Sequence, residues 1–320
     1  MARGLFRRLE QLLVLDLSDN QLSSSHIDDG TFVGLIRLIV LNLSHNALTR
    51  IGAHTFKDLF FLQILDLRNN SIGYIEDNAF LPLYNLHTLN LAENRLHHIS
   101  SLLFNGLFVL SKLTLSNNLI MNIDPQAFRN CSDLKELDLS SNALTKVPEA
   151  LKELSFLKTL DLGENQISDF KNGSFKNLQQ LNGLRLIGNS IGNLTRVNLK
   201  WLDIHGNFIE RLDNYFKIQT GLHIKTLDAS HNRITEISTM SIPNSVELLF
   251  INNNMISLVH TNTFLDKRDL VRVDMYANEL VKLDLNALRL SPVPENKTLP
   301  EFYIGGNPFH CDCSNESGCK

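Results

Sequence analysis

Three cysteines crowd one short segment of the chain, NPFHCDCSNESGCK. Thiolate, imidazole and carboxylate groups bind transition metals, so Cys311, Cys313 and Cys319, together with His310 and Asp312, could form a metal site. Clustered cysteines in secreted proteins form disulfide-bonded frameworks instead. We favour a disulfide-bonded cap without a metal, which predicts an oxidising, extracellular setting.

Catalytic and cofactor-binding motifs are absent from the sequence. It contains no GxSxG elbow, P-loop, GxGxxG fingerprint or HExxH motif. The eleven histidines are scattered, and we interpret the adjacent His97 and His98 as a solvent-facing pair in preference to a metal-ligand pair. Cys131, in FRNCSDL, is expected to be a buried free thiol. We therefore predict a protein that is not an enzyme and holds no cofactor.

Composition and charge limit the classes of partner. The apolar fraction is 43 %, the net charge is −4 and both signs of charge are present, which argues against disorder and against a nucleic-acid-binding surface. No stretch reaches about 18 consecutive apolar residues, the length a membrane span needs. The opening MARGLFRRLEQLLVLDLS lacks the apolar core of a secretory signal. We expect a fragment, or a chain whose export signal is missing.

A nine-residue pattern, LxxLxLxxN, recurs thirteen times and leaves little sequence outside it. The positions of most residues in the fold therefore follow from their place in this repeat. Successive copies lie 18 to 29 residues apart, mainly in the range of leucine-rich repeats. The copies end at Asn20, Asn46, Asn70, Asn94, Asn118, Asn142, Asn165, Asn189, Asn207, Asn232, Asn254, Asn278 and Asn307. We predict a solenoid over residues 1–306, with about thirteen repeats, and an incomplete C-terminal cysteine cap over 307–320.

The pattern has a direct physical interpretation as a short strand followed by a turn. In the second copy, Leu38, Leu41 and Leu43 point into one core, whereas Asn42 points out of the opposite face. Stacking such coils buries a continuous leucine column and pairs the strands in parallel. The closing asparagines should face inward and bond the backbone where it turns, forming an amide ladder. The predicted fold is an α/β repeat solenoid, a leucine-rich-repeat horseshoe with a parallel β-sheet on its concave face and irregular or short helical convex segments.

A second column consists of phenylalanines ten residues after the repeat asparagine, with a few equivalents in coils of other lengths. We interpret it as a buried spine and not as a recognition stripe. Its members are Phe56, Phe80, Phe104, Phe128, Phe175 and Phe264, with Phe32, Leu151, Phe216 and Leu288 in the equivalent place.

The outward strand positions are where a partner would bind. Their central column is Asp16, Asn42, Asp66, Asn90, Thr114, Asp138, Asp161, Arg185, Asp203, Asp228, Phe250, Asp274 and Tyr303. Lysines fill an adjacent column, so we expect a solvated, mutually neutralised face and not a cation site. Trp201, Phe250, Tyr276 and Tyr303 also fall in outward positions and are our candidate partner-binding residues, since exposed aromatics are enriched in binding hot spots. The alternative is that these four side chains pack against each other or against flanking loops.

Seven N-x-S/T sequons could carry N-linked glycans in a secreted protein. They are Asn42, Asn69, Asn130, Asn172, Asn193, Asn296 and Asn315. Asn42 projects from a strand onto the concave face, so a glycan there would move ligand contacts toward later coils or the flanks.

Several segments together resemble the ectodomain of insect Toll receptors. They are the run from Phe32 to Asn118, KTLDASHNRITEIS (Lys225 to Ser238), SIPNSVELLFINNN (Ser241 to Asn254) and FYIGGNPFHCDC (Phe302 to Cys313). The resemblance implies a single-pass receptor, outside the cell at the plasma membrane, that binds a secreted cystine-knot ligand or another surface receptor, dimerises, and serves innate-immune or developmental signalling. The alternatives are a leucine-rich-repeat adhesion or guidance protein and an extracellular scaffold.

The sequence departs from that family in what it lacks. It has no TIR domain, transmembrane helix or N-terminal cysteine cap, so we expect a truncated piece that recognises a ligand but does not signal alone. Family caps continue beyond CDC with further cysteines, whereas this chain reads SNESGCK. A Cys311–Cys319 or a Cys313–Cys319 disulfide would fit the resemblance, and one of the three cysteines would stay unpaired.

One coil is too short. Only 18 residues separate Asn189 from Asn207, whereas a turn of such a solenoid needs about 20. Family members carry additional repeats in this region, so the junction near Arg196-Val197 is interpreted as a deletion or splice boundary, or else as a strained coil. We predict a kink or weak point within this irregular coil, residues 190–207.

Overall fold

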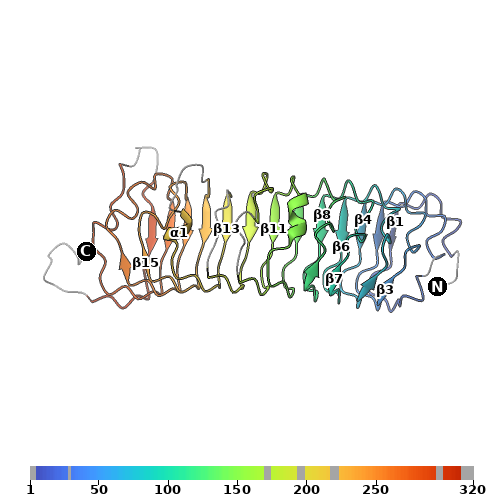
Figure 1. Cartoon of the computed structure of the whole chain (residues 1–320), viewed down its shortest axis with the longest axis horizontal. Helices are drawn as coiled ribbons and strands as arrows, with labels where there is room; N and C mark the ends of the chain where they lie inside the picture. Colours follow the sequence, from blue (N-terminus) through green and yellow to red (C-terminus); the bar gives the residue numbers. More distant parts are fainter. Residues whose placement is uncertain are drawn as a thin grey trace. The chain divides into compact units, whose positions relative to one another are not determined.

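The computed structural model describes residues 5–27, 30–168, 174–192, 199–216, 223–292 and 298–310. It contains two compact units, Met1–Leu181 and Asn182–Lys320. Each unit is a solenoid whose coils contribute one short strand apiece to a parallel sheet (Figure 1). The predicted leucine-rich-repeat fold is therefore confirmed within each unit.

The first unit holds seven sheet strands in its described residues, paired in parallel in chain order. They are β1 (Val14–Asp16), β2 (Val40–Asn42), β4 (Ile64–Asp66), β6 (Thr88–Asn90), β8 (Lys112–Thr114), β10 (Glu136–Asp138) and β11 (Thr159–Asp161). Two small parallel sheets lie elsewhere on the coils: β3 (Arg50–Ile51) with β5 (Tyr74–Ile75), and β7 (His98–Ile99) with β9 (Asn122–Ile123). A 3-10 helix, η1 (Glu149–Glu153), follows β10 in sequence.

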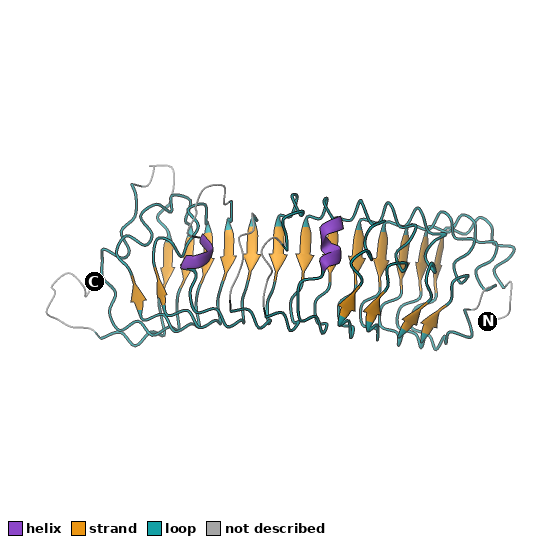
Figure 2. Ribbon diagram, viewed as in Figure 1, coloured by secondary structure: helices purple, strands orange, loops and turns teal. Residues whose placement is uncertain are grey.

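The second unit is built in the same way, with six sheet strands in the part of it that the structure describes. They are β12 (Gly183–Arg185), β13 (Trp201–Asp203), β14 (Thr226–Asp228), β16 (Leu248–Phe250), β18 (Arg272–Asp274) and β19 (Glu301–Tyr303). The strands β15 (Glu236–Ile237) and β17 (Leu258–Val259) form a small separate sheet, and α1 (Asp213–Phe216) is a single helical turn. Figure 2 shows how little helix lies in the described segments between the sheet strands.

The repeat asparagines form the predicted amide ladder. Asn118 is buried, and its Nδ2 donates to the carbonyl oxygens of Leu91, Leu115 and Ser116 at 2.9, 3.1 and 3.3 Å. Its Oδ1 accepts from the backbone N–H of Leu96 at 3.0 Å. The amide thus satisfies backbone groups of its own coil and of the coil before it, which a buried turn requires.

The residue before each repeat asparagine has a positive φ, between 49° and 70° in all thirteen copies. Most are not glycine, so the turn holds an L-residue in a conformation that costs free energy. The hydrogen bonds that the side-chain amide of the repeat asparagine donates and accepts stabilise that turn.

The phenylalanine spine is confirmed, with one correction. Rings of neighbouring coils stack 5.8 to 6.4 Å apart in several pairs, and most spine members are fully buried. Phe6, which the sequence pattern did not indicate, extends the stack beyond Phe32. Leu288 was predicted to be inward, but it is only half-buried and the neighbouring Ala287 is buried in its place. The coil that ends at Asn307 is the longest, so a fixed offset no longer lands on the spine.

The short coil keeps the sheet regular on both of its sides. Strands β12 and β13 pair in register, with Leu184 opposite Leu202. Asn207 still donates to the carbonyl of Leu186 at 3.0 Å, and Leu199 is buried. The predicted kink or weak point near Arg196-Val197 lies outside the described residues.

Two further predictions concern residues that the structure does not describe or that it describes in part. Cys311, Cys313 and Cys319, with the cap proposed for 307–320, lie outside the described residues except for 307–310. Within the described ranges, no helix has both the length and the apolar character to cross a membrane.

Candidate ligand-binding surface

The four aromatic residues predicted to face outward lie along the sheet of the second unit. Tyr276 and Tyr303 expose 41 % and 42 % of their surface, and Trp201 and Phe250 are half-buried. Trp201, Phe250 and Tyr303 lie in strands and alternate with inward residues, as Phe250 does with the buried Leu249, whereas Tyr276 lies two residues beyond the end of β18. The outward placement was therefore predicted correctly, whereas partner binding by these residues stays a prediction.

Arginines cover two of these aromatic side chains. The guanidinium carbon of Arg185 lies 5.9 Å from the centre of the Trp201 ring, and that of Arg272 lies 4.4 Å from the Tyr303 ring. Both are cation–π contacts. Trp201 and Tyr303 thus pack against arginines from the neighbouring strands, and not in the way that the alternative of packing among aromatics or against loops predicted.

Trp201 also covers a glycine. A Cβ atom added to Gly183 on β12 would lie 2.0 Å from Cε2 of Trp201, so the indole occupies the space of that missing side chain. Neither Gly183 nor Arg185 was a candidate from the sequence. The signal was available, because the two residues occupy in β12 the positions that Trp201 and Asp203 occupy in β13.

Two outward carboxylates, Asp203 and Asp274, have an arginine beside them, whereas Asp138 and Asp228 accept hydrogen bonds from the serines that follow them. Asp274 is buried and receives two hydrogen bonds from Arg272, at 2.8 and 2.9 Å. Burial raises the pKa of Asp203, and the nearby Asp228 raises it further, while the backbone N–H of His205 and the charge of Arg185 act in the opposite direction. Asp274 is thus neutralised by Arg272 but is not solvated, so the expected solvated, mutually neutralised face is wrong at this position.

Tyr303 has a carboxylate partner on its own strand. Its hydroxyl donates to Oε2 of Glu301 at 2.8 Å, and this bond raises the pKa of the phenol. The side chain thus contacts both Arg272 and Glu301 and is still 42 % exposed.

The first unit has an outward surface of aliphatic side chains, which was not among the sequence predictions. Val14, Val40 and Ile64 stand side by side in register on β1, β2 and β4, and Val14 and Ile64 are exposed, as is Leu13. The signal was a run of apolar residues at the third repeat position of the first three coils. Asn42 lies beside them, and its Oδ1 accepts hydrogen bonds from N and Oγ of Ser44.

The other sequons differ in accessibility. Asn69 is exposed at a turn, with its Nδ2 2.9 Å from Nδ1 of His45. Asn130 is half-buried, and its Nδ2 donates to Oδ1 of Asn105. Asn172, Asn193, Asn296 and Asn315 lie outside the described residues.

The remaining titratable candidates are separate from this surface. His97 and His98 are both exposed, as predicted, and His98 lies 3.5 Å from the carboxylate of Asp124. Cys131 is fully buried and free, which confirms that prediction, and burial raises the pKa of its thiol to about 12.

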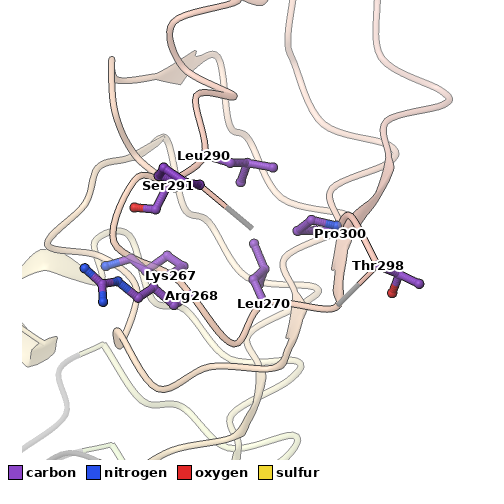
Figure 3. A pocket seen from close by; sticks show the side chains of 8 residues that line it. Lys267, Arg268, Leu270, Leu290, Ser291, Thr298 and Pro300 are labelled. Atoms are coloured by element: carbon purple, nitrogen blue, oxygen red, sulfur yellow. The ribbon is translucent and has the colours of Figure 1, made fainter. Parts of the chain in front are cut away.

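A small cavity lies between residues 267–270 and the segments around Leu290 and Pro300 (Figure 3). Its volume is about 20 Å³, room for about one water molecule. Lys267 lines it and is only 3 % exposed, and burial lowers the pKa of this lysine to about 8. Its Nζ donates to the carbonyl of Thr239 and to Oδ1 of Asn244, at 2.9 and 2.5 Å. The cavity is too small for an organic ligand, and the lysine is held as a structural donor.

The chain is similar to known repeat proteins in sequence and in fold. The leucine rich repeat family model matches residues 23–72, 60–120 and 108–167. Toll-like receptor 7 of Drosophila melanogaster is 57 % identical over 369 aligned positions, covering 92 % of this chain and 26 % of that receptor. An internalin of Listeria monocytogenes superposes with a TM-score of 0.71 at 20 % identity, covering 95 % of this chain and 83 % of the internalin. The structure of the Toll–Spatzle complex of Drosophila gives a TM-score of 0.53 at 19 % identity, covering 88 % of this chain and 49 % of that one. Identities this low show the fold alone.

The alignment with the Drosophila receptor contains a large difference in length. Since 92 % of 320 residues is about 294 residues, about 75 of the 369 aligned positions hold a residue in the receptor and none in this chain. At the commonest spacing of 24 residues, that is about three coils.

Proposed function

This chain belongs to the leucine-rich-repeat proteins and is similar over most of its length to part of a Toll receptor, and on that premise we propose that it is a ligand-recognition segment of a Toll receptor ectodomain. It acts outside the cell, binds a secreted protein, and contributes to innate-immune or developmental signalling by the complete receptor. We propose recognition and not catalysis.

The ligand we propose is a secreted cystine-knot protein. One neighbour in fold is a Toll receptor in complex with Spatzle. A protein ligand would bind this chain through the exposed side chains on its sheet. Another surface receptor, or a second copy of the receptor, could occupy the same kind of surface in a homodimer or heterodimer.

The observation that carries this proposal is the outward aromatic surface of the second unit. Tyr276 and Tyr303 are substantially exposed, and the ion pairs Arg272–Asp274 and Lys225–Glu247 lie in the same unit. Large aromatics with arginines beside them are the residues that most often dominate protein interfaces. We therefore place the ligand on this face, with Trp201 and Phe250 as further contacts.

The test is a binding measurement with the secreted chain and purified Spatzle, extended to other secreted cystine-knot proteins. Tyr276→Ala and Phe250→Ala are each expected to weaken binding at least about tenfold. Tyr74→Ala is the matched control, because Tyr74 is 61 % exposed on β5, in the other unit, and should leave affinity unchanged.

The outcomes separate the parts of the proposal. Absence of binding to every cystine-knot protein tried would reject the ligand class. Tight binding that is indifferent to Tyr276 and Phe250 would reject the surface. The second candidate function, adhesion to another cell surface, is supported by the exposed aliphatic side chains of Val14 on β1 and Ile64 on β4. Recovery of a membrane protein but no secreted protein in a pull-down would favour it.

A further inference from the structure

Two places on the outward face of the second unit have the same composition, an aspartate on one strand and an aromatic residue beside it on the next strand. Asp274 on β18 is the register partner of Tyr303 on β19, and Asp228 on β14 is the register partner of Phe250 on β16. Neighbouring strands are about 4.8 Å apart, so the two side chains of each pair are close. The two pairs can therefore be compared residue by residue.

The pair of Asp274 and Tyr303 holds a cation that the chain itself supplies. Arg272, two residues before Asp274 on β18, donates to both carboxylate oxygens, at 2.8 and 2.9 Å. Its guanidinium carbon also lies 4.4 Å from the centre of the Tyr303 ring. The ion pair and the cation–π contact favour the same position of the guanidinium. An aspartate–aromatic pair of this sheet thus accommodates a basic side chain.

The pair of Asp228 and Phe250 lacks such a cation. The place that Arg272 occupies on β18 is taken on β14 by Thr226, whose side chain is short and neutral. Oδ1 of Asp228 accepts from N and Oγ of Ser230, at 3.0 and 2.6 Å. Among the residues that the structure describes, no basic side chain forms an ion pair with Asp228.

The other outward carboxylates make the charge imbalance larger at this point. Asp203 on β13 is the register partner of Asp228 on its other side. Burial and the nearby Asp228 raise the pKa of Asp203, while Arg185, 3.5 Å away, acts in the opposite direction. Arg272 neutralises Asp274. The two arginines thus stand beside the first and the last of three outward aspartates, and the uncompensated negative charge lies at Asp228.

We propose that Asp228 and Phe250 bind a basic side chain of the protein ligand, in the way that Asp274 and Tyr303 hold Arg272. The inference rests on the proposed function of this face and deepens it, because it names the chemistry of the ligand segment. Charge complementarity selects the occupant: the cation meets the Asp228 carboxylate while its stem or its planar group packs on Phe250. Arginine fits this place better than lysine, since its planar fork matches a carboxylate and stacks on a ring.

The first experiment needs no ligand, because it supplies the cation from within the chain. Thr226→Arg places a guanidinium two residues before Asp228, where Arg272 stands relative to Asp274. We expect Thr226→Arg to raise the midpoint of urea unfolding above that of Thr226→Gln, and Asp228→Asn to abolish this gain when it is added to both variants. Asp228→Asn keeps the oxygen that accepts from Ser230, so it removes only the charge. A gain that persists in the presence of Asp228→Asn, or no gain at all, would overturn the inference.

The second experiment measures affinity for Spatzle or whichever cystine-knot protein binds. Asp228→Asn is expected to weaken binding at least about tenfold and to reduce its dependence on salt concentration. Thr226→Arg should weaken binding equally, because its own guanidinium occupies the site. Asp138→Asn is the matched control, since this outward aspartate of the other unit also accepts from the serine two residues later, and it should leave affinity unchanged. Loss of affinity with Asp138→Asn as large as with Asp228→Asn would contradict the assignment.

The third experiment identifies the occupant by a double-mutant cycle. Each arginine and lysine of the bound cystine-knot protein is replaced by glutamine, and affinity is measured for the wild-type chain and for Asp228→Asn. We expect one basic residue whose replacement weakens binding to the wild-type chain at least about tenfold and binding to Asp228→Asn less than about threefold. The inference is wrong if no basic residue behaves in this way.

These outcomes are distinguishable from failure of the proposed function. If Tyr276→Ala weakens binding but Asp228→Asn does not, this inference fails and the proposed function stands. If neither substitution weakens binding, both fail. If no cystine-knot protein binds, the proposed ligand class fails, and the unfolding measurements on Thr226→Arg decide whether Asp228 and Phe250 hold a guanidinium.

Discussion

Asn118 and Leu91 are joined across neighbouring coils by a hydrogen bond of 2.9 Å, in which Nδ2 of Asn118 donates to the carbonyl oxygen of Leu91. The same amide accepts from the N–H of Leu96, two residues after the preceding repeat asparagine, Asn94. Each coil therefore completes the turn of the coil before it. This reciprocal arrangement makes the repeat asparagine a connection between coils as much as a part of its own turn.

Asn118→Ala is expected to lower the free energy of unfolding by about 2–4 kcal/mol, because it leaves buried backbone groups in two coils without partners. The measurement is chemical unfolding followed by circular dichroism. Asn122→Ala, at an exposed asparagine of β9, is the control and should change stability by less than about 0.5 kcal/mol. Equal effects of the two substitutions would contradict the role of the ladder.

The ladder, the strands and most of the spine could be predicted because their positions are set by a local period. The predictions fail where the number of residues after the repeat asparagine no longer indicates a residue's position in the coil. Leu288 lies in the longest coil, so ten residues past the asparagine no longer reaches the spine. Phe6 has no repeat asparagine before it from which to count. The Gly183–Trp201 contact was missed because it joins different coils, and a period within one coil does not describe which side chains meet across the sheet.

Phe80→Ala is expected to destabilise the first unit by about 3–5 kcal/mol, since the ring is fully buried and the surrounding coils cannot close around the cavity. The ring of Phe56 lies 6.0 Å away in a stacked arrangement, so part of the loss comes from that pair. Phe61→Ala removes an exposed ring one coil earlier and is the matched control. Thermal unfolding of both variants tests the prediction, and a Phe80→Ala protein as stable as Phe61→Ala would refute it.

Cys131 is expected to resist alkylation in the folded protein and to react after unfolding, because its thiol is fully buried and its pKa is raised to about 12. Mass spectrometry of the peptide that contains Cys131, with and without denaturant, measures this. The raised pKa also predicts a pH effect. Above the ordinary thiol value of 9.0 only the unfolded chain loses the proton, so stability falls as pH rises from 9 toward 12.

The pH effect of Cys131 is about 1 kcal/mol between pH 9 and pH 10. Cys131→Ala should remove this part of the pH dependence while changing stability elsewhere by a constant amount. Rapid alkylation of the native thiol at neutral pH, or identical alkaline slopes for wild type and Cys131→Ala, would contradict the burial of this group.

Lys267 is expected to make the free energy of unfolding rise with pH, which is opposite to the effect of Cys131, and to do so in a lower pH range. Burial lowers the pKa of this lysine from 10.5 to about 8, so between these values the unfolded chain carries a proton that the folded chain has released. Stability therefore rises with pH across this interval, and it is lower below pH 8, where the folded protein must hold a buried charge. The rise is roughly 1 kcal/mol between pH 8 and pH 9.

Lys267→Met should flatten that rise, because methionine keeps the apolar stem and has no proton to release. It also leaves the carbonyl of Thr239 and the amide oxygen of Asn244 without this donor, which costs about 1–3 kcal/mol at every pH. The slope of stability against pH, measured by urea unfolding at pH 7.5, 8, 8.5 and 9, is thus the informative quantity and not the absolute value. Lys282→Met, at an exposed lysine of the same unit, is the control and should follow the wild-type slope. A Lys267→Met protein with the wild-type slope between pH 8 and pH 9 would show that the buried ammonium does not titrate there.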